Sequence, residues 1–193
     1  RRAAALACCD VSHPEVVDFI NAKLVDGEIS HFNISVLINE EFIRAVENDE
    51  MWTFKFKQKE YGKIRSRELW NLIIKNMIEK AEPGLLNSTN LYKNNSWYYD
   101  PVVSTNPCGE AVLENYGSCC LGSLVLPNFI TGSVNTNWKK LENTIKLAIR
   151  FLDNVIDVNK YSLRNIEMKA QNSRRIGMGI LGLAEYLFAK QLR

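Results

Sequence analysis

Strand-like and helix-like patterns alternate through the first half of this 193-residue chain. Residues 3–11 are small and apolar, and residues 32–38 are rich in β-branched side chains, so both are predicted to form buried strands. In residues 52–56 aromatic side chains alternate with polar ones, which is the period of a half-buried strand. Apolar side chains at helical spacing mark three further segments, residues 16–23, 40–47 and 66–81. This alternation predicts an α/β fold.

Local signals predict where several elements begin and end. Asn39 and Ser66 each precede a helical pattern and are expected to cap it, because their side-chain oxygens can accept a hydrogen bond from the first turn. Residues 87–100 are rich in Asn, Ser and Tyr and are expected to be irregular. A short strand is expected at residues 111–113, and a polar connector at residues 131–137.

The last third of the chain is predicted to be mostly helical. Apolar residues repeat at helical spacing over residues 138–157, and a helix-rich segment is expected over 163–191. Gly177, Gly179 and Gly182 interrupt that segment with the spacing of a dinucleotide-binding fingerprint. Such a fingerprint requires a strand directly before it. We expect a helical pattern there instead, so we reject the dinucleotide interpretation.

The overall composition excludes several classes of protein. The net charge is only +2 and shows no basic stripe, so neither nucleic acid nor a membrane surface is an expected partner. No apolar run approaches the roughly 18 residues of a membrane-spanning helix. The five cysteines are an odd number without a repeated spacing, which argues against a secreted disulfide framework. A reducing cytoplasm is the expected location, and no metal site is predicted.

One short motif carries most of the chemical information. Asn106, Cys108 and Glu110 place an amide, a thiol and a carboxylate at alternating positions, separated by Pro107 and Gly109. Alternate side chains of an extended segment point the same way, so these three groups are candidates to meet one small ligand. Pro and Gly favour a tight, irregular loop. The alternative is that Cys108 is an ordinary structural cysteine, because free cysteines mostly behave as small hydrophobic residues.

The wider sequence around this motif resembles the large subunits of ribonucleotide reductases, whose pattern reads NPCGE and then SCNLGS. Here the corresponding strings are STNPCGE at residues 104–110 and YGSCCLGS at residues 116–123. Further blocks follow the family order, namely residues 13–20, 32–36, 41–49, 152–157 and 174–179. Blocks spread over nearly the full length make a chance similarity improbable.

The resemblance implies part of a ten-stranded α/β barrel with a central finger loop that carries Cys108. Residues 1–193 would then form one partial catalytic barrel domain, because the large subunits of this family are several times longer. The chain begins without Met and ends directly after an apolar helical pattern, so we expect it to be an internal piece. The resemblance also implies that the substrate phosphate loop and one redox cysteine lie outside it.

The same resemblance implies a radical reaction that reduces ribonucleotides to deoxyribonucleotides. Cys108 would form the thiyl radical that removes the 3′ hydrogen, Glu110 would accept the proton of the 3′-hydroxyl, and Asn106 would hold the ribose hydroxyls. The alternative is a non-catalytic structural fragment of a split or truncated subunit, active only when assembled with the missing parts.

Cys119 aligns with one thiol of the redox pair that re-reduces the site. Cys120 stands where the family usually has Asn, so it is open which of the two thiols is redox-active. Arg1 and Arg2 align with the end of the loop that reports the identity of an allosteric effector to the substrate base.

Cofactors and partners are also implied only by the resemblance. Adenosylcobalamin is the favoured source of the radical, and a separate di-metal small subunit is the alternative. Deoxynucleoside triphosphates and ATP are expected as effectors, and thioredoxin or glutaredoxin as the reductant. The full subunit is expected to be a homodimer. Whether the substrate is a diphosphate or a triphosphate is left open.

Several other residues have structural interpretations. Cys8 and Cys9 lie in an apolar run and are expected to belong to the core. His13 precedes Pro14 at a helix start and is expected to be structural. Arg174 and Arg175 form either a phosphate site or an ordinary scaffold pairing, and we favour the scaffold.

Overall fold

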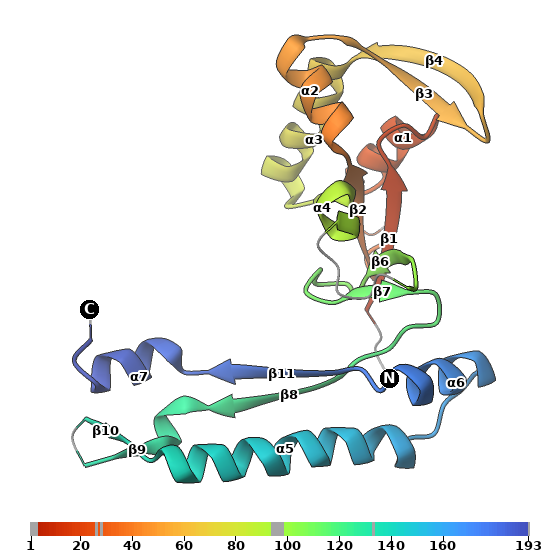
Figure 1. The fold of residues 1–193 in the computed structure, drawn as a ribbon. Coiled ribbons are helices and arrows are strands. Elements are labelled where there is room, and N and C mark those ends of the chain that lie inside the picture. Colours follow the sequence, from red (N-terminus) through yellow and green to blue (C-terminus); the bar gives the residue numbers. More distant parts are fainter. Residues whose placement is uncertain (1–3, 26, 28, 94–98, 133, 193) are drawn as a thin grey trace. The chain divides into compact units, whose positions relative to one another are not determined.

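The computed structural model describes residues 4–25, 27, 29–93, 99–132 and 134–192. It divides into two compact units, Arg1–Asn115 and Tyr116–Arg193 (Figure 1). Each unit contains its own parallel strand pairing, and each is described separately below.

A three-stranded parallel sheet forms the centre of the first unit. β2 (Phe32–Ile38) lies between β1 (Ala5–Asp10) and β5 (Gly84–Asn87), so β2 is the middle strand. Parallel neighbours need a long connection between them. The connections here contain the helices α1 (Val16–Asn21), α2 (Glu40–Asn48) and α3 (Ser66–Lys80).

The three helices pack against one face of this sheet. The buried cluster combines side chains from the β1–α1 region, from β2 and from the helices, namely Val11, Val16, Ile20, Val36, Ile38, Phe42, Leu69 and Ile73. Side chains alternate between the two faces of a strand, so Asn33 and Ser35 of β2 belong to the opposite face. In β1, Cys9 packs against the cluster, whereas Cys8 Sγ lies 3.5 Å from Ser104 Oγ. The core interpretation of this cysteine pair therefore holds for Cys9.

The two predicted helix caps have different outcomes. Asn39 Oδ1 accepts a hydrogen bond from the amide of Phe42 at 2.8 Å, so the predicted cap of α2 is confirmed. The predicted cap at Ser66 is wrong, because α3 begins at Ser66 itself. The Ser66 hydroxyl instead donates to the Ala45 carbonyl at 2.7 Å. Ser66 is fully buried, so its hydroxyl needs this partner.

Several elements of the first unit, including β5, were not predicted. β4 (Lys59–Arg65) returns antiparallel to β3 (Met51–Phe56). α4 (Ser88–Lys93) lies in the segment that was expected to be irregular. Its first turn is capped by Asn87, whose Oδ1 accepts from the amide of Asn90 at 3.1 Å. The polar composition that indicated a loop therefore includes a helix-capping residue, while residues 94–98 lie outside the described part of the chain.

A small hairpin lies against the second face of the sheet. β6 (Val102–Thr105) and β7 (Val112–Glu114) pair antiparallel, and β7 lies one residue later than the predicted strand. In Figure 1 the hairpin is drawn near the end of β1 and β2 where these strands begin. We call the connection between its strands, residues 106–111, the Cys108 loop.

The second unit is built on a pair of parallel strands and a long helix. β8 (Cys120–Val125) pairs with β11 (Ile176–Leu181), and α5 (Trp138–Val158) lies between them in the chain, as predicted from its helical periodicity. Leu152 and Ile156 of α5 are each only 4% exposed. Leu152 packs over Gly122 of β8, where an added Cβ would lie 3.3 Å from Leu152 Cδ1.

The prediction of a helix-rich segment at residues 163–191 is wrong in its middle. Gly177 and Gly179 lie inside β11, between α6 (Arg164–Ser173) and α7 (Leu183–Ala189). A Cβ on Gly177 would lie 2.5 Å from Leu121 Cδ2. Because glycine has no Cβ, the Leu121 side chain of the neighbouring strand can pack over this position. Glycines inside a strand do not form the strand-to-helix turn of a dinucleotide site. The rejection of that site therefore stands, for a different reason.

Short elements complete the second unit. A single 3₁₀ turn, η1 (Leu126–Phe129), follows β8. β9 (Ile130–Thr131) and β10 (Asn135–Thr136) then pair in the segment predicted to be a polar connector.

The α/β class is confirmed. Among the described residues, the strands form one three-stranded and four two-stranded sheets rather than a closed barrel. Closure of a barrel requires continuous pairing around a ring, so the ten-stranded barrel stays a prediction.

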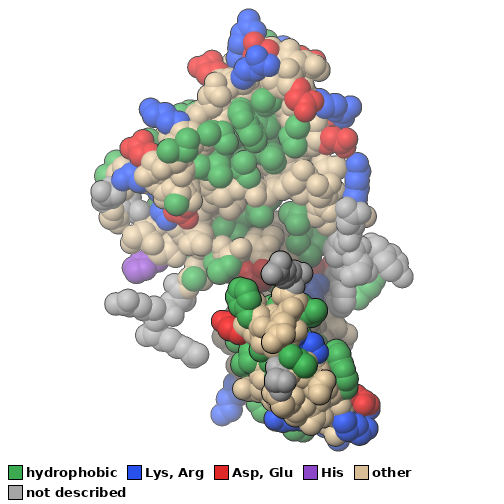
Figure 2. All heavy atoms as spheres, turned by 90° about the vertical axis from the view of Figure 1, so that its left-hand side faces the viewer, with side chains coloured by type: hydrophobic (Ala, Val, Ile, Leu, Met, Phe, Trp, Pro, Cys, Tyr) green, Lys and Arg blue, Asp and Glu red, His purple; other side chains and the backbone are tan. Residues whose placement is uncertain are grey.

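Large hydrophobic side chains are exposed in both units, and Figure 2 shows many of them on one face. On α5 they include Leu147, Phe151 and Val158, which are 69%, 66% and 76% exposed. At about 100° per residue these three lie on the side of the helix opposite to Leu152 and Ile156. α5 therefore has two apolar sides, of which one is covered by its own unit.

Candidate active site

The Cys108 loop is a tight turn held by its own backbone. The amide of Asn106 donates to the Ala111 carbonyl at 3.1 Å, and the amide of Gly109 donates to the Asn106 carbonyl at 3.0 Å. Gly109 has φ +84°, which a residue without a side chain adopts at little cost. The turn that Pro107 and Gly109 favoured is therefore present, and Cys108 lies at its tip with an exposed side chain.

Asn106 contributes to the closure of the loop as well as to its surface. Its Oδ1 accepts a hydrogen bond from the Ala111 amide at 3.0 Å. Because this oxygen has a structural role, the NH₂ group of Asn106 is the part that would donate to a ligand. An extended backbone would align Asn106, Cys108 and Glu110 on one side. The observed turn changes that geometry, so their convergence on one ligand stays a prediction.

Cys108 opens onto a cavity of about 210 Å³ between the loop and the sheet. Its wall includes Pro107 and Gly109 of the loop, and Asn33 and Ser35 of the second face of β2. Typical ligand pockets measure roughly 300–1,000 Å³. The cavity is therefore smaller than a typical pocket for a whole ligand.

Glu82 is the carboxylate residue in the wall of this cavity, and the sequence analysis did not single it out. Its Oε1 accepts from the Ile34 amide at 3.2 Å, and its other oxygen forms an ion pair with Lys23. Glu82 therefore supports β2 from the side. Among the described residues, Asn106 and Glu110 flank the wall in sequence without forming part of it. The sequence carried no signal for Glu82 beyond its place at the predicted end of a helix, because its partners on Ile34 and Lys23 are brought near only by folding.

Cys119 lies in the second unit, next to a separate cavity of about 370 Å³. Cys120 lines the same cavity, together with Lys160, Tyr161 and Arg175. Cys119 Sγ packs over Gly177, at 3.4 Å from where a Cβ would lie. Since both cysteines line one cavity, its lining does not distinguish which of them is redox-active.

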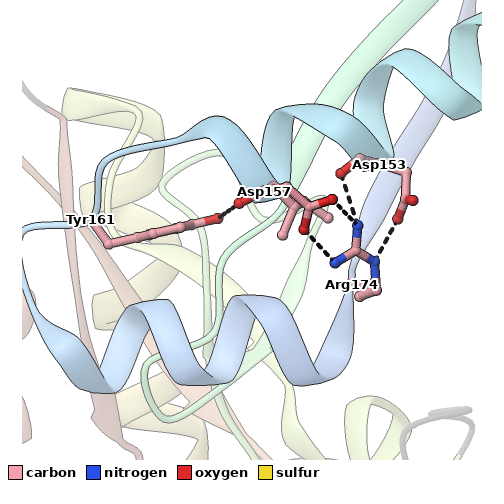
Figure 3. Close-up of polar contacts among 5 residues, drawn as sticks. Asp153, Asp157, Tyr161 and Arg174 are labelled. Atoms are coloured by element: carbon pink, nitrogen blue, oxygen red, sulfur yellow. Dashed lines mark hydrogen bonds and ion pairs between the residues drawn. The ribbon is translucent and has the colours of Figure 1, made fainter.

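Arg174 is a scaffold residue of the second unit (Figure 3). Its Nε donates to Asp153 Oδ1 at 2.7 Å, and its two terminal nitrogens donate to Asp157 at 2.8 and 3.1 Å. The hydrogen bond from Arg174 lowers the pKa of the Asp157 carboxyl and raises the pKa of the guanidinium. Arg174 follows α6 and both aspartates lie on α5, so the cluster joins the two helices. The scaffold interpretation of Arg174 is confirmed.

The family follows from a comparison with known protein families. The model described as "Ribonucleotide reductase, barrel domain" matches residues 1–193, the whole chain. The chain belongs to the ribonucleotide reductase family. The Cys108 loop and the Cys119 cavity are therefore features of a ribonucleotide reductase barrel domain.

Individual ribonucleotide reductases show the same relationship. The chain is 38% identical to a vitamin B12-dependent ribonucleoside-diphosphate reductase of Mycobacterium tuberculosis, over 98% of this chain and 28% of that protein. It is 34% identical to a protein of the same name from Thermoplasma acidophilum, over all of this chain and 26% of the relative. The large chain of a ribonucleoside-diphosphate reductase from Schizosaccharomyces pombe is 26% identical, again over all of this chain and 28% of the relative. The chain thus spans about a quarter of these reductases.

The remaining predicted residues of this reductase chain have varied outcomes. Arg1 and Arg2 lie outside the described residues. Burial raises the pKa of the Cys9 thiol to about 11, and nearby Asp10 and Glu15 act in the same direction. Within the described part of the chain, no helix is long and apolar enough to cross a membrane, and no group of three or more His, Cys, Asp or Glu side chains is placed to hold a metal ion.

Proposed function

We propose that the full-length protein containing this chain reduces ribonucleotides to deoxyribonucleotides, with Cys108 as the thiol that attacks the sugar. The observation that carries this proposal is the exposed Cys108 at the tip of a tight loop, facing a cavity of about 210 Å³. Membership of the ribonucleotide reductase family supports it.

The reaction begins when the Cys108 thiyl radical removes the hydrogen atom from C3′ of the ribose. An S–H bond forms and the unpaired electron moves to the carbon. Glu110 accepts the proton of the 3′-hydroxyl as a general base, and one thiol of a dithiol gives its proton to the 2′-hydroxyl, which leaves as water. The dithiol then delivers a hydrogen atom to C2′ and one electron to the 3′-carbonyl, and so becomes a disulfide, while Glu110 returns its proton to the 3′ oxygen. Cys108 finally returns its hydrogen atom to C3′. The thiyl radical is thereby restored.

Each residue has a distinct role in this proposal. Asn106 binds a ribose hydroxyl through its NH₂ group, because its oxygen already accepts from Ala111. Cys119 supplies one thiol of the reducing pair, and its partner thiol lies outside this chain. Thioredoxin or glutaredoxin reduces the resulting disulfide. Arg1 and Arg2 take part in communication with deoxynucleoside triphosphate or ATP effectors.

Adenosylcobalamin is the proposed source of the radical. When bound, it supplies the one-electron oxidation of the Cys108 thiol, and the exposure of Cys108 at the loop tip fits that requirement. The relatives at 34–38% identity are named vitamin B12-dependent reductases, whereas the large chain from Schizosaccharomyces pombe is 26% identical. A di-metal small subunit is the alternative source. The names of the two B12-dependent relatives favour a diphosphate substrate.

The full subunit is further proposed to be a cytoplasmic homodimer. The proposed partners are the ribonucleotide substrate, the thiol reductant and, in the alternative case, the small subunit. These proposals rest on the family relationship.

The decisive experiment replaces Cys108 in the full-length protein. Cys108→Ser should lower turnover by at least about a thousandfold, because a hydroxyl does not form a comparably accessible radical. The thermal midpoint should be unchanged, because Cys108 is exposed. Cys8→Ser is the matched control, since the new hydroxyl can keep the contact with Ser104 and turnover should persist. Normal turnover in a folded Cys108→Ser variant would reject the proposed function.

A further inference from the structure

Asn33 connects the Cys108 loop to the sheet. It lies near the start of β2, on the face opposite to the helices, and its Nδ2 donates to the Pro107 carbonyl at 3.1 Å. The two residues are 74 positions apart in the sequence. Three other hydrogen bonds of the loop join residues 106, 109 and 111 to one another, and a fourth runs from the Thr105 hydroxyl to the neighbouring Asn106 carbonyl, so these bonds fix its local shape. The hydrogen bond from Asn33 holds the Cys108 loop against the sheet.

The Pro107 carbonyl belongs to the peptide group that joins Pro107 to Cys108. Proline has no backbone N–H, so this carbonyl is the polar backbone group through which Pro107 can be held. A donor on the carbonyl restrains rotation of the peptide plane directly before Cys108. The orientation of that plane determines where the Cys108 side chain leaves the backbone.

Asn33, the donor of this hydrogen bond, lies on a strand that is held by several interactions. β2 is the middle strand of its sheet, paired on both sides. Ile34, the next residue, donates its amide to Glu82, and Glu82 pairs with Lys23. Asn33 also lines the cavity onto which Cys108 opens. The loop is therefore tied to the central strand of the three-stranded sheet, at a residue that pairs with Leu6 of β1.

We propose that Asn33 is a positioning residue for Cys108, which holds the sulfur at the distance needed to take a hydrogen atom from the substrate. This inference rests on the proposed function of Cys108. Transfer of a hydrogen atom occurs only at short range, and small misplacements of a reacting group lower rates steeply. Loss of the donor should therefore lower kcat and leave KM nearly unchanged.

The experiment compares variants of the full-length protein. Asn33→Ala should lower kcat on the order of tenfold, change KM by less than about twofold, and leave the thermal midpoint in place, because Asn33 is an exposed residue. Asn48→Ala is the matched control: Asn48 is in the same unit and donates to Glu50 at 3.2 Å, remote from the loop in sequence. That variant should keep the kcat of the parent protein.

Asn33→Asp adds a readout that a purely structural role would not produce. The substituted carboxyl has nearly the same volume, but it donates only when it is protonated, which occurs as the pH approaches its ordinary pKa of about 4. The kcat of Asn33→Asp relative to that of the parent should rise as the pH is lowered from 7 to 5. The corresponding ratio for Asn33→Ala should stay flat.

The remaining outcomes overturn the inference. An unchanged kcat in Asn33→Ala, together with an inactive Cys108→Ser variant, rejects the role of Asn33 and leaves the proposed function intact. A raised KM at constant kcat would make Asn33 a substrate contact. A lower thermal midpoint with a flat pH ratio in Asn33→Asp would make its role structural. An active Cys108→Ser variant rejects the proposed function itself.

Discussion

Cys119 and Cys120, at the start of β8, both line one cavity, although the side chains of neighbouring residues in an extended strand usually point in opposite directions. Cys119 precedes β8 and Cys120 is its first residue, so the regular alternation is only beginning there. Both cysteines are half-buried. Their chemical roles must therefore be separated by substitution.

Replacing each of these thiols should give different results in the full-length protein. Cys119→Ser should permit a single reduction but abolish repeated turnover with a dithiol or thioredoxin, because the reducing pair would lack one sulfur. Cys120→Ser should turn over repeatedly, and so serves as the matched control. The measurement is the number of deoxynucleotides formed per active site. If the two phenotypes are exchanged, the redox role belongs to Cys120.

Single residues also mark the limit of prediction from the sequence. The cap at Asn39 could be predicted because it acts within one turn of its own helix. The hydrogen bond from the Ser66 hydroxyl could not be predicted, because the Ala45 carbonyl that accepts it is brought near only by packing. In the sequence, Asn33 was only one member of the block at residues 32–36 that resembles the family pattern. Its hydrogen bond to Pro107 could not be predicted, because that bond depends on the folded sheet. Cys108 could be predicted as a candidate from its local motif, whereas the cavity beside it is known only from the structure.

At the level of elements, α5 and α6 are joined by charge as well as by apolar contacts. Arg174 ends α6 in a left-handed conformation with φ +46° and spans Asp153 and Asp157, one helical turn apart on α5 (Figure 3). A guanidinium bound by two carboxylates fixes orientation better than a single ion pair does. The nearby Tyr161 hydroxyl donates to the Ile156 carbonyl at 3.0 Å, which fixes the connection between the helices.

The Asp157 pair should stabilise the second unit above acidic pH. The pKa of Asp157 is lower in the folded state than its ordinary value of 3.8, so its contribution is present above that value and is lost as the pH falls through the folded-state pKa. Asp157→Asn should therefore lower the thermal midpoint at pH 7, and the difference from the parent should shrink below about pH 3.8.

Glu142→Gln provides the matched control for this prediction. Glu142 also lies on α5, but it pairs with the amine of Lys146 four residues later on the same exposed helix face and so joins no second element. Such surface pairs contribute about 0.3–0.5 kcal/mol, so the thermal midpoint should change little at either pH. Equal effects of the two substitutions at pH 7 would contradict a special role for Asp157.

The element pattern was predictable where one periodicity dominated. α5 and β2 were predicted closely because their apolar side chains repeat regularly over their whole length. β11 was missed because its two glycines resemble breaks in a helix, while in the structure they leave room for side chains of the neighbouring strand, Leu121 at Gly177 and Ser123 at Gly179. That pairing joins residues more than 50 positions apart, which a local pattern does not record.

At the scale of the whole molecule, each unit exposes apolar surface that its own residues leave uncovered. The second apolar side of α5, with Leu147, Phe151 and Val158, is one example. Contiguous exposed apolar surface commonly marks sites of contact with other protein segments. The chain spans about a quarter of its reductase relatives, so we place the activity tests in the full-length protein.

The source of the radical is a property of that full-length protein. We expect deoxynucleotide formation when adenosylcobalamin is the only added cofactor and no second subunit is present. Activity should disappear when adenosylcobalamin is omitted. Activity that requires an added di-metal small subunit would overturn this prediction, and the roles proposed for Cys108, Glu110 and Asn106 would be unaffected. Parallel assays with ribonucleoside diphosphates and triphosphates would identify the substrate class.

The protonated state of Cys9 determines the order in which thiol reagents would modify the first unit. Maleimides react with thiolates, and a thiol whose pKa is about 11 is almost wholly protonated at neutral pH. Cys108 has an exposed side chain, whereas Cys9 packs against the core. A fluorophore or nitroxide could therefore be attached at Cys108 with Cys9 left in place. Such a label would report movements of the loop tip by spectroscopy without disturbing the apolar interior.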